Sequence, residues 1–218
     1  MAKLRETKVS MAVVRRLPRY FRHLGDLMDK EVERISSEEL SARMGVTSSQ
    51  VRQDLNNFGA FGQQGYGYNV ANLYGVISRI LGLDLEYHLV LVGAGNAGRA
   101  LVHHEGFAKR GFSFKAIFDA CPSKIGTKLG DITIKNVDEL EGYLKANKVD
   151  IVGLTVPDEA VEDVLPVLID SNIRGIWNFC QIDLKVPSRI MVESVLLADS
   201  LMTLSYKINE DQIIHRLV

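Results

Sequence analysis

The sequence reads Leu89-Val-Leu-Val-Gly-Ala-Gly-Asn-Ala-Gly98 near its centre, and this stretch decides the fold of the residues around it. An apolar run typical of a buried β-strand covers residues 87–92, and a helical pattern follows over residues 97–109. Between them, three glycines have the spacing G-x-G-x-x-G. A strand, these glycines and a helix together form the fingerprint of a dinucleotide-binding Rossmann unit.

Each glycine of the fingerprint has a physical task. Gly93 permits a tight turn, Gly95 lets the backbone approach a pyrophosphate, and Gly98 allows close packing of the helix. The pyrophosphate would lie at the positively polarised helix N-terminus. The predicted phosphate-binding residues are Gly93, Ala94, Gly95, Asn96, Ala97 and Gly98. The alternative is a glycine-rich turn that binds no ligand.

A second strand is predicted over residues 114–118, and it leads into Asp119. An acid about twenty residues past the fingerprint binds the hydroxyls of the adenosine ribose, which favours NAD over NADP. Lys124 lies close enough in sequence to accept a 2′-phosphate, so NADP is the alternative ligand.

Strands and helices alternate beyond this second strand, which predicts an α/β fold with a doubly wound parallel sheet. The predicted strands cover residues 131–134, 149–156 and 175–179, and the predicted helices cover residues 137–146 and 159–170. Ligands bind beyond the carboxyl ends of such strands at a switch point. Thr155, Val156 and Pro157 are therefore predicted to line the nucleotide cleft, although a plain strand-to-helix turn would explain them equally well.

Composition places the chain among globular proteins. Its 218 residues are 46% hydrophobic, enough to bury a sizeable core. The first ten residues are polar and charged, no apolar run reaches the length of a membrane span, and a cytoplasmic protein is expected. Cys121 and Cys180 lack the spacing of a zinc site or a C-x-x-C motif, so neither a structural metal nor a disulfide framework is expected. A reactive thiol at Cys121 is the alternative to an inert loop cysteine.

Charge is divided unevenly along the chain. Residues 1–80 hold 12 Lys and Arg against 8 Asp and Glu, whereas the remainder holds 14 against 19. A basic module thus precedes an acidic one, which suggests a polyanionic partner for the first; a solvated helix face would explain the excess as well.

The basic module has the pattern of a helix-turn-helix. Residues 9–28 carry a helical pattern that Pro18 is expected to break. Ser36 and Glu39 fit a capping box that opens a short helix ending near Gly45, and a second box begins at Thr47. Two capped helices joined by a glycine-containing turn are typical of this motif.

The second of these helices has two distinct faces. Val51, Leu55 and Phe58 form an apolar stripe that must point into a core. The remaining face carries Gln, Asn, Arg and Ser, which are residue types that read base edges in the major groove. The predicted DNA-contacting residues of this helix are Ser48, Ser49, Arg52, Gln53 and Asn56. An ordinary amphipathic helix with a solvated polar face is the competing interpretation.

A glycine-rich segment, residues 58–68, follows directly and favours the DNA-binding interpretation. Its glycines alternate with aromatic residues, as in a tight β-hairpin whose tip approaches a phosphate backbone. A hairpin after a recognition helix is a wing, and Gln63, Gln64 and Tyr66 are predicted to contact DNA from it. A helix over residues 70–81 and a short linker complete the module.

The chain closes with a short strand, residues 190–195, and an apolar helix, residues 196–208. The helix carries a broad hydrophobic stripe that needs another surface to cover it. Homodimerisation through this helix is the simplest solution, and a symmetric dimer would present two recognition helices to a palindromic operator.

The sequence as a whole resembles the redox-sensing transcriptional repressor Rex family from about residue 9 to residue 207. The matching strings include Arg16-Leu-Pro-Arg-Tyr20, Gln50-Val-Arg-Gln-Asp-Leu55, Phe61-Gly-Gln-Gln-Gly-Tyr-Gly-Tyr-Asn-Val70, Gly93-Ala-Gly-Asn-Ala-Gly98, Thr155-Val-Pro157, Trp177-Asn-Phe179 and Leu204-Ser-Tyr206. The resemblance implies a homodimer in which NADH binding weakens operator binding and NAD⁺ competes. It also implies three parts, namely a winged-helix domain (1–82), a Rossmann domain (83–195) and a swapped C-terminal helix with its tail (196–218).

Some positions depart from the family's common pattern. Members often have Tyr where His104 stands and Asp where Leu196 stands, and both join an arginine matching Arg16 in an interdomain switch. Leucine cannot accept a hydrogen bond, so Asp199, about one helical turn on, is a candidate substitute. In the reading helix, Gln53 stands where Lys is common, and Gln63 and Gln64 replace basic residues.

Two other functions remain as alternatives. An NAD-dependent dehydrogenase would need a general acid or base beside the nicotinamide, and its candidates are His88, His103 and His104. Surface or packing roles explain these histidines better, and a dehydrogenase would not need the N-terminal module. A sensor of coenzyme A or another adenine nucleotide would use the same fingerprint. We therefore expect a regulator that binds NADH and NAD⁺ rather than an enzyme.

Overall fold

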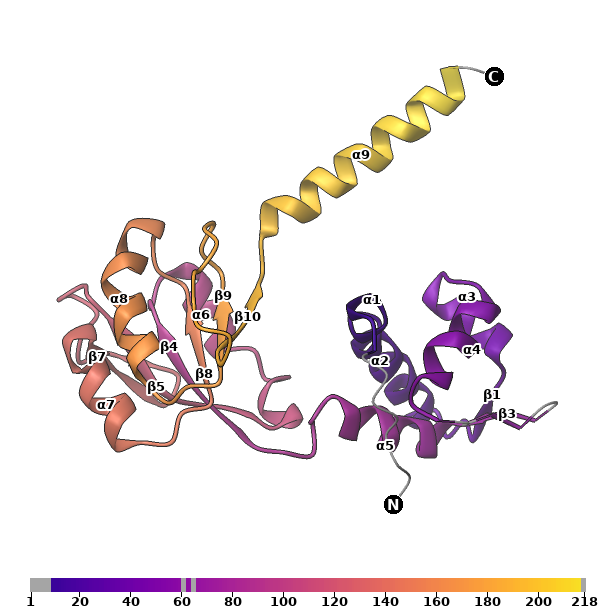
Figure 1. Ribbon diagram of the computed structural model, residues 1–218, viewed down its shortest axis with the longest axis horizontal. Coiled ribbons are helices and arrows are strands. Elements are labelled where there is room, and N and C mark those ends of the chain that lie inside the picture. Colours follow the sequence, from indigo (N-terminus) through magenta and orange to yellow (C-terminus); the bar gives the residue numbers. More distant parts are fainter. Residues whose placement is uncertain (1–8, 60–61, 64–65, 217–218) are drawn as a thin grey trace. The chain divides into compact units, whose positions relative to one another are not determined.

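The structure is a computed structural model that describes residues 9–59, 62–63 and 66–216. The chain divides into two compact units, Met1–Leu85 and Glu86–Val218, which Figure 1 colours from indigo to magenta and from magenta to yellow. Within the described residues, no helix is both long enough and apolar enough to cross a membrane.

The first unit contains five α-helices among its described residues. They are α1 (Met11–Val14), α2 (Leu17–Met28), α3 (Ser37–Met44), α4 (Ser48–Asn56) and α5 (Val70–Ile80). The break expected near Pro18 is present between α1 and α2. Pro18 lies in the first turn of α2, where its missing N–H costs no helical hydrogen bond, so it begins a helix instead of kinking one.

The predicted helix-turn-helix is α3 and α4. The Ser36 hydroxyl accepts from the Glu39 N–H, while the Glu39 carboxylate accepts from the Ser36 N–H, so the first capping box is complete. The helix ends at Gly45, whose φ of +62° is the left-handed conformation that glycine favours. The second box is only half formed: Thr47 caps the Gln50 N–H, but the Gln50 side chain turns to another acceptor.

A three-stranded antiparallel sheet supplies the wing. Its strands β1 (Arg34–Ile35), β2 (Gly62–Gln63) and β3 (Gly67–Asn69) are ordered β1-β3-β2. Gly67 has a φ of +69°, and a Cβ there would lie 2.5 Å from the Ile35 carbonyl oxygen, so only glycine fits. The hairpin was predicted, but the third strand was not, because two residues are too few to show an alternating pattern. Gln64, which was predicted to contact DNA, lies outside the described residues.

The second unit is built on a seven-stranded sheet ordered β10-β9-β8-β4-β5-β7-β6. The strands are β4 (Tyr87–Val92), β5 (Phe112–Asp119), β6 (Lys128–Leu129), β7 (Ile132–Asn136), β8 (Ile151–Leu154), β9 (Gly175–Asn178) and β10 (Met191–Ser194). All neighbours pair in parallel except β6 with β7. The order reverses between β4 and β8, which is the switch point of a doubly wound sheet.

Helices cover both faces of this sheet (Figure 1). They are α6 (Asn96–Val102), α7 (Leu140–Ala146) and α8 (Asp158–Asp170), with 3₁₀ turns at Ala108–Arg110 and Val137–Glu139. Side chains of α7 and α8 pack on Val90, Phe118 and Leu154, whereas those of α6 pack on the opposite face beside Leu91 and Ile117.

The helix predicted over residues 97–109 is too long, because α6 ends at Val102. Gly106 would weaken a continuous helix by about 1 kcal/mol relative to alanine. In the structure its N–H donates instead to the His104 ring, 3.2 Å away. The turn places Phe107 edge-on to Trp177, with ring centroids 5.4 Å apart.

The last helix, α9 (Leu197–Arg216), is longer than predicted. Every side chain from Leu197 to Glu210 is exposed. The large apolar ones are each at least 52% exposed, namely Leu197, Leu201, Met202, Leu204, Tyr206 and Ile208. Leaving so many large apolar side chains in water is unfavourable, as expected for a helix that needs a second surface.

Candidate functional site

The glycine loop between β4 and α6 has the geometry that its fingerprint predicts. Gly93 has a φ of +101°, and a Cβ there would lie 2.5 Å from the Thr155 carbonyl oxygen. A Cβ on Gly98 would lie only 2.2 Å from the Gly93 carbonyl oxygen, whereas a Cβ on Gly95 would meet nothing within 4 Å. Two glycines are therefore required by packing, and Gly95 alone faces open space where a ligand backbone contact is possible.

Thr155 fastens this loop across the switch point. It follows β8, and its hydroxyl donates to the Gly93 carbonyl oxygen at 2.7 Å. A side-chain hydrogen bond therefore joins the start of the glycine loop to the segment that follows β8. Thr155 was predicted to line the cleft, and in the structure it also fixes the shape of the loop.

Asp119, the last residue of β5, is buried and braces the loop from the other side. Its Oδ2 accepts from the Ala94 N–H at 2.7 Å and from the Lys124 ammonium at 2.9 Å, and its Oδ1 accepts from the Cys121 N–H at 2.8 Å. Burial would raise the pKa of Asp119, but the hydrogen bonds from Cys121, Lys124 and Ala94 outweigh it, so the pKa lies below its usual range. The carboxylate is therefore charged at neutral pH.

A cavity of about 880 Å³ opens beside the loop, at the carboxyl ends of β4, β5 and β8. This is within the size range of small-molecule sites. Nine of the predicted cofactor-binding residues line it, namely Gly93, Gly95, Asn96, Ala97, Asp119, Lys124, Thr155, Val156 and Pro157. Ala94 and Gly98 are buried behind them.

The same cavity is also lined by residues that were not predicted from the sequence. They come from the segment after β7 and from α8, and they include Val137, Asp138, Leu140, Glu141, Asp163 and Val167. Helical periodicity marks Leu140 only as a core position, and no local motif marks the acids. Cys121 also lines the cavity, and its hydrogen bond with the Ser123 hydroxyl lowers the pKa of its thiol.

The predicted reading face of α4 is exposed. Val51 and Leu55 are buried and Phe58 is half-buried, as the apolar stripe requires. The opposite side chains are exposed at Ser49, Arg52, Gln53 and Asn56, and Ser48 is half-buried. Arg52 donates to the Ser37 hydroxyl at 3.0 Å, so its guanidinium is held against the start of α3.

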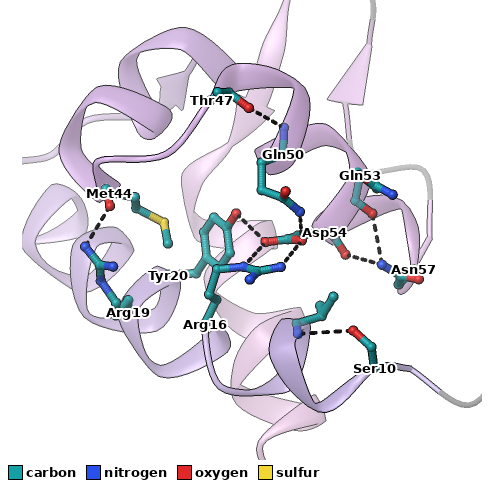
Figure 2. Close-up of polar contacts among 11 residues, drawn as sticks. Ser10, Arg16, Arg19, Tyr20, Met44, Thr47, Gln50, Gln53, Asp54 and Asn57 are labelled. Carbon is teal, nitrogen blue, oxygen red and sulfur yellow. Dashed lines mark hydrogen bonds and ion pairs between the residues drawn. The ribbon is translucent and has the colours of Figure 1, made fainter. Parts of the chain in front are cut away.

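The inner side of α4 carries a residue that the sequence analysis did not single out. Asp54 is completely buried, and Arg16 donates to both of its oxygens at 2.7 Å (Figure 2). The Tyr20 hydroxyl and the Gln50 amide donate to it as well, at 3.1 and 2.8 Å. The signal was present in the sequence, because an acid three residues after Val51 and directly before Leu55 must lie on the apolar face.

The wing contributes Tyr66, which is 69% exposed. The guanidinium of Arg34 lies 5.9 Å from the centre of its ring and also donates to its backbone carbonyl. Gln63 belongs to β2, but its side chain, like Gln64, lies outside what the structure describes.

Comparisons with known proteins match both units. The family model described as "Putative DNA-binding protein N-terminus" matches residues 8–56, and the model "CoA binding domain" matches residues 84–182. The redox-sensing transcriptional repressor Rex of Clostridioides difficile is 52% identical over 202 residues, which cover 93% of this chain and 96% of the relative. The Rex repressor of Thermoanaerobacter pseudethanolicus is 49% identical over 213 residues, which cover 98% of this chain and 95% of the relative. The chain belongs to the Rex family.

Solved structures of the Rex family agree with this assignment. A crystal structure of the Rex-family repressor RSP in complex with β-NAD⁺ and operator DNA matches with a TM-score of 0.89 and 50% identity, covering 97% of this chain and 98% of RSP. The complex of RSP with β-NADH also matches with a TM-score of 0.89, at 46% identity, covering 98% and 100% of the two chains. The predicted winged-helix and Rossmann architecture is confirmed, as is a repressor rather than a dehydrogenase.

Arg16, His104 and Asp199 were assigned to the interdomain switch, and the structure shows the contacts of each within its own unit. Arg16 has its partner, Asp54, inside the first unit. His104 is exposed and stacks on Phe107, with ring centroids 4.4 Å apart. Asp199 is exposed in the first turn of α9 and lines a cavity of about 240 Å³ together with Leu196 and Met202. The assignment of these residues to a switch stays a prediction.

Proposed function

We propose that this chain is a repressor that binds a palindromic operator as a homodimer and leaves it when NADH occupies the cavity beside the glycine loop. One observation carries the proposal: a ligand-sized cavity around an accessible Gly95 and an exposed polar helix face occur in the same chain. A relative that matches over nearly the whole chain was solved with both NAD⁺ and operator DNA.

The residues around the cavity fit NADH and NAD⁺. The open face of Gly95 and the N-terminus of α6 would hold the pyrophosphate, and Lys124 would lie beside the adenosine ribose. The Lys124 ammonium is engaged by Asp119, and three further carboxylates line the cavity, at Asp138, Glu141 and Asp163. This excess of negative charge disfavours the 2′-phosphate of NADP.

Coenzyme A is the second candidate ligand, because a CoA-binding family model matches most of this unit. It shares the adenosine and the pyrophosphate with NADH, so the glycine loop alone does not distinguish them. Coenzyme A carries a 3′-phosphate on its ribose, which the same acidic lining disfavours.

The exposed helix α9 supports the dimer. Its apolar side chains would be covered by a second copy, as in a swapped arrangement, and the two reading helices would then meet successive half-sites. In that arrangement the chain has a winged-helix part (1–82), a Rossmann part (83–195) and a dimerisation helix with its tail (196–218). Arg16, His104 and Asp199 would couple the parts, and the protein would act in the cytoplasm, where a bacterial repressor meets its operator.

A mobility-shift assay on sheared genomic DNA tests the proposal. The wild-type chain should retain a small set of fragments at about 0.15 M salt and release them on addition of NADH. NAD⁺ should reduce the effect of NADH, and coenzyme A should have none. Release by coenzyme A but not by NADH would reverse the ligand assignment, and failure to select any fragment would contradict the repressor function.

A further inference from the structure

Asp54 is an unusual residue for the inner face of a small helical unit. It has no exposed surface, yet it lies among apolar residues of the core that include Leu17, Tyr20, Val51 and Leu55. A buried carboxylate is strongly unfavourable unless donors surround it. Here four donor atoms from three side chains reach its two oxygens, at distances from 2.7 to 3.1 Å.

The donors come from two different places in the fold. Arg16, at the break between α1 and α2, and Tyr20, in α2, belong to one helix pair, whereas Gln50 is on α4 with Asp54 itself (Figure 2). The bidentate contact of Arg16 therefore ties the start of α2 to the second half of α4. A planar guanidinium that meets both carboxylate oxygens fixes direction as well as distance. Apolar contacts alone would let one helix rotate or slide on the other at little cost.

Stability alone does not explain this ion pair. Replacing a buried pair with apolar residues of similar size is often neutral or stabilising, and specifying one arrangement of the fold is the other role attested for such pairs. What it specifies follows from its neighbours along the helix. Arg52 and Gln53 immediately precede Asp54, and Asn56 follows two residues later, all three exposed on the other side of α4. Any rotation of α4 about its own axis would displace these three side chains together.

We propose that Asp54 is a positioning residue for DNA recognition, and that the Arg16–Asp54 pair sets the rotation and height at which α4 presents its exposed side chains to the bases. The inference rests on the proposed operator binding. It assigns no DNA contact to Asp54 itself, which is buried. Arg16 fixes α4 from the side opposite its exposed reading face. Gln50 and Tyr20 orient the Asp54 carboxylate so that both of its oxygens meet the Arg16 guanidinium.

The test uses the full chain in three variants. Arg16→Met/Asp54→Leu replaces the pair with apolar side chains of similar size, and Asp54→Asn removes only the charge. Arg15→Met is the matched control, because it removes the neighbouring, exposed arginine charge and leaves Asp54 untouched. For each, the measurements are the unfolding temperature, the affinity for NADH, and the affinities for a wild-type-selected fragment and for a scrambled one at the same salt.

The double variant should keep the unfolding temperature of the wild type, while its preference for the selected fragment, measured without NADH, falls on the order of tenfold. Its affinity for scrambled DNA should stay near that of the wild type, since losing one positive and one negative charge leaves the net charge unchanged, whereas Arg15→Met loses one positive charge and should bind scrambled DNA more weakly. Base preference, measured on single-substitution operators, should relax at several positions of each half-site at once, whereas loss of one reading side chain relaxes one position. That breadth is the signature of a displaced helix.

A folded double variant that keeps the wild-type preference would overturn the inference. If the double variant does not fold, Asp54→Asn decides, because it preserves the shape of the side chain; an unchanged preference in that variant overturns the inference equally. Failure of the proposed function would be distinguishable, because the wild-type chain itself would then select no fragment in the mobility-shift assay.

Discussion

The carboxylate of Asp119 lies 2.7 Å from the backbone nitrogen of Ala94, within the glycine loop that precedes α6. The contact joins the end of β5 to the loop after β4, and the Lys124 ammonium completes it from the cavity side. The acid that the fingerprint predicts as a ribose ligand is thus also an internal brace of the phosphate-binding loop.

Substitution Asp119→Ala should weaken NADH and NAD⁺ together. It leaves the buried Ala94 N–H without its acceptor, which costs roughly 1–3 kcal/mol, and it removes the counter-charge of Lys124. Titration of the dihydronicotinamide fluorescence, with NAD⁺ as competitor, measures both affinities. Asp131→Ala, which removes an exposed carboxylate of the same unit, should leave them unchanged. Unaltered NADH binding in the Asp119 variant would contradict the role of this acid.

The pair Gly95→Ala and Gly98→Ala should separate ligand binding from folding. A methyl group on Gly95 meets open space, so the variant should unfold at the wild-type temperature yet bind NADH poorly. A methyl group on Gly98 would lie 2.2 Å from the Gly93 carbonyl oxygen, so that variant should lose stability as well. Thermal unfolding and NADH titration distinguish the two outcomes. Normal NADH affinity in Gly95→Ala would place the pyrophosphate elsewhere.

Arg52→Ala should weaken binding to the selected operator by roughly 1–3 kcal/mol, the range of a bidentate base contact. Its guanidinium is exposed on α4 and already held by Ser37, so little conformational freedom is lost when it meets DNA. Arg79→Ala removes an exposed charge from α5 and serves as the control for general electrostatics. Equal losses in both variants would mean that Arg52 contributes charge and reads no base.

Gln53→Lys should change the base preference of the protein at one pair in each half-site. Glutamine bonds adenine in a bidentate manner, whereas lysine donates to the guanine acceptors, so the preferred pair should shift from A·T toward G·C. Operators that differ only at that pair, tested against both proteins, measure the shift, and each mismatch should cost about 1–3 kcal/mol. If both proteins rank the operators identically, the exposed Gln53 does not read that base.

Stability should fall in acid partly through Asp119. Because its hydrogen bonds hold the folded pKa below the ordinary value of about 3.9, its contribution is present above that value and is lost as the pH falls through the lower, folded pKa. The difference in unfolding free energy between the wild type and Asp119→Asn should therefore be constant near neutral pH and shrink below about pH 4. A difference that grows as the pH falls would contradict a depressed pKa.

The sequence predicted most of the elements because their signals are local. The strand before the fingerprint was placed with the observed bounds, Tyr87–Val92, since a Leu- and Val-rich run directly before a glycine turn allows few alternatives. The capping box at Ser36 and the left-handed Gly45 bracket α3 as expected. In contrast, α6 was extended too far, because a side-chain contact of His104 with the backbone competes with the helix and leaves no periodic trace.

The candidate site was predicted only in part, because some of its residues are far apart in the sequence and share no motif. Asp119, Thr155 and most residues of the glycine loop carry motifs of their own and line the cavity, whereas Ala94 and Gly98 are buried. The acids after β7 and on α8 reach the same cavity only because the sheet order brings those segments together. Likewise, the partner of Arg16 lies 38 residues away on another helix, and no spacing rule connects the two.

The bracing of the glycine loop has a consequence for how the oxidised and reduced cofactors are told apart. Thr155 and Asp119 hold this loop in shape through the protein's own hydrogen bonds, so its ordering entropy does not depend on which cofactor enters. NADH and NAD⁺ are identical from adenine to pyrophosphate and differ by the hydride at C4 of the nicotinamide ring, which changes the charge and pucker of that ring. Contacts of a rigid loop with this shared half add the same binding free energy to NADH and to NAD⁺. They therefore do not change the ratio of the two affinities. Redox discrimination must arise entirely at the other end of the molecule.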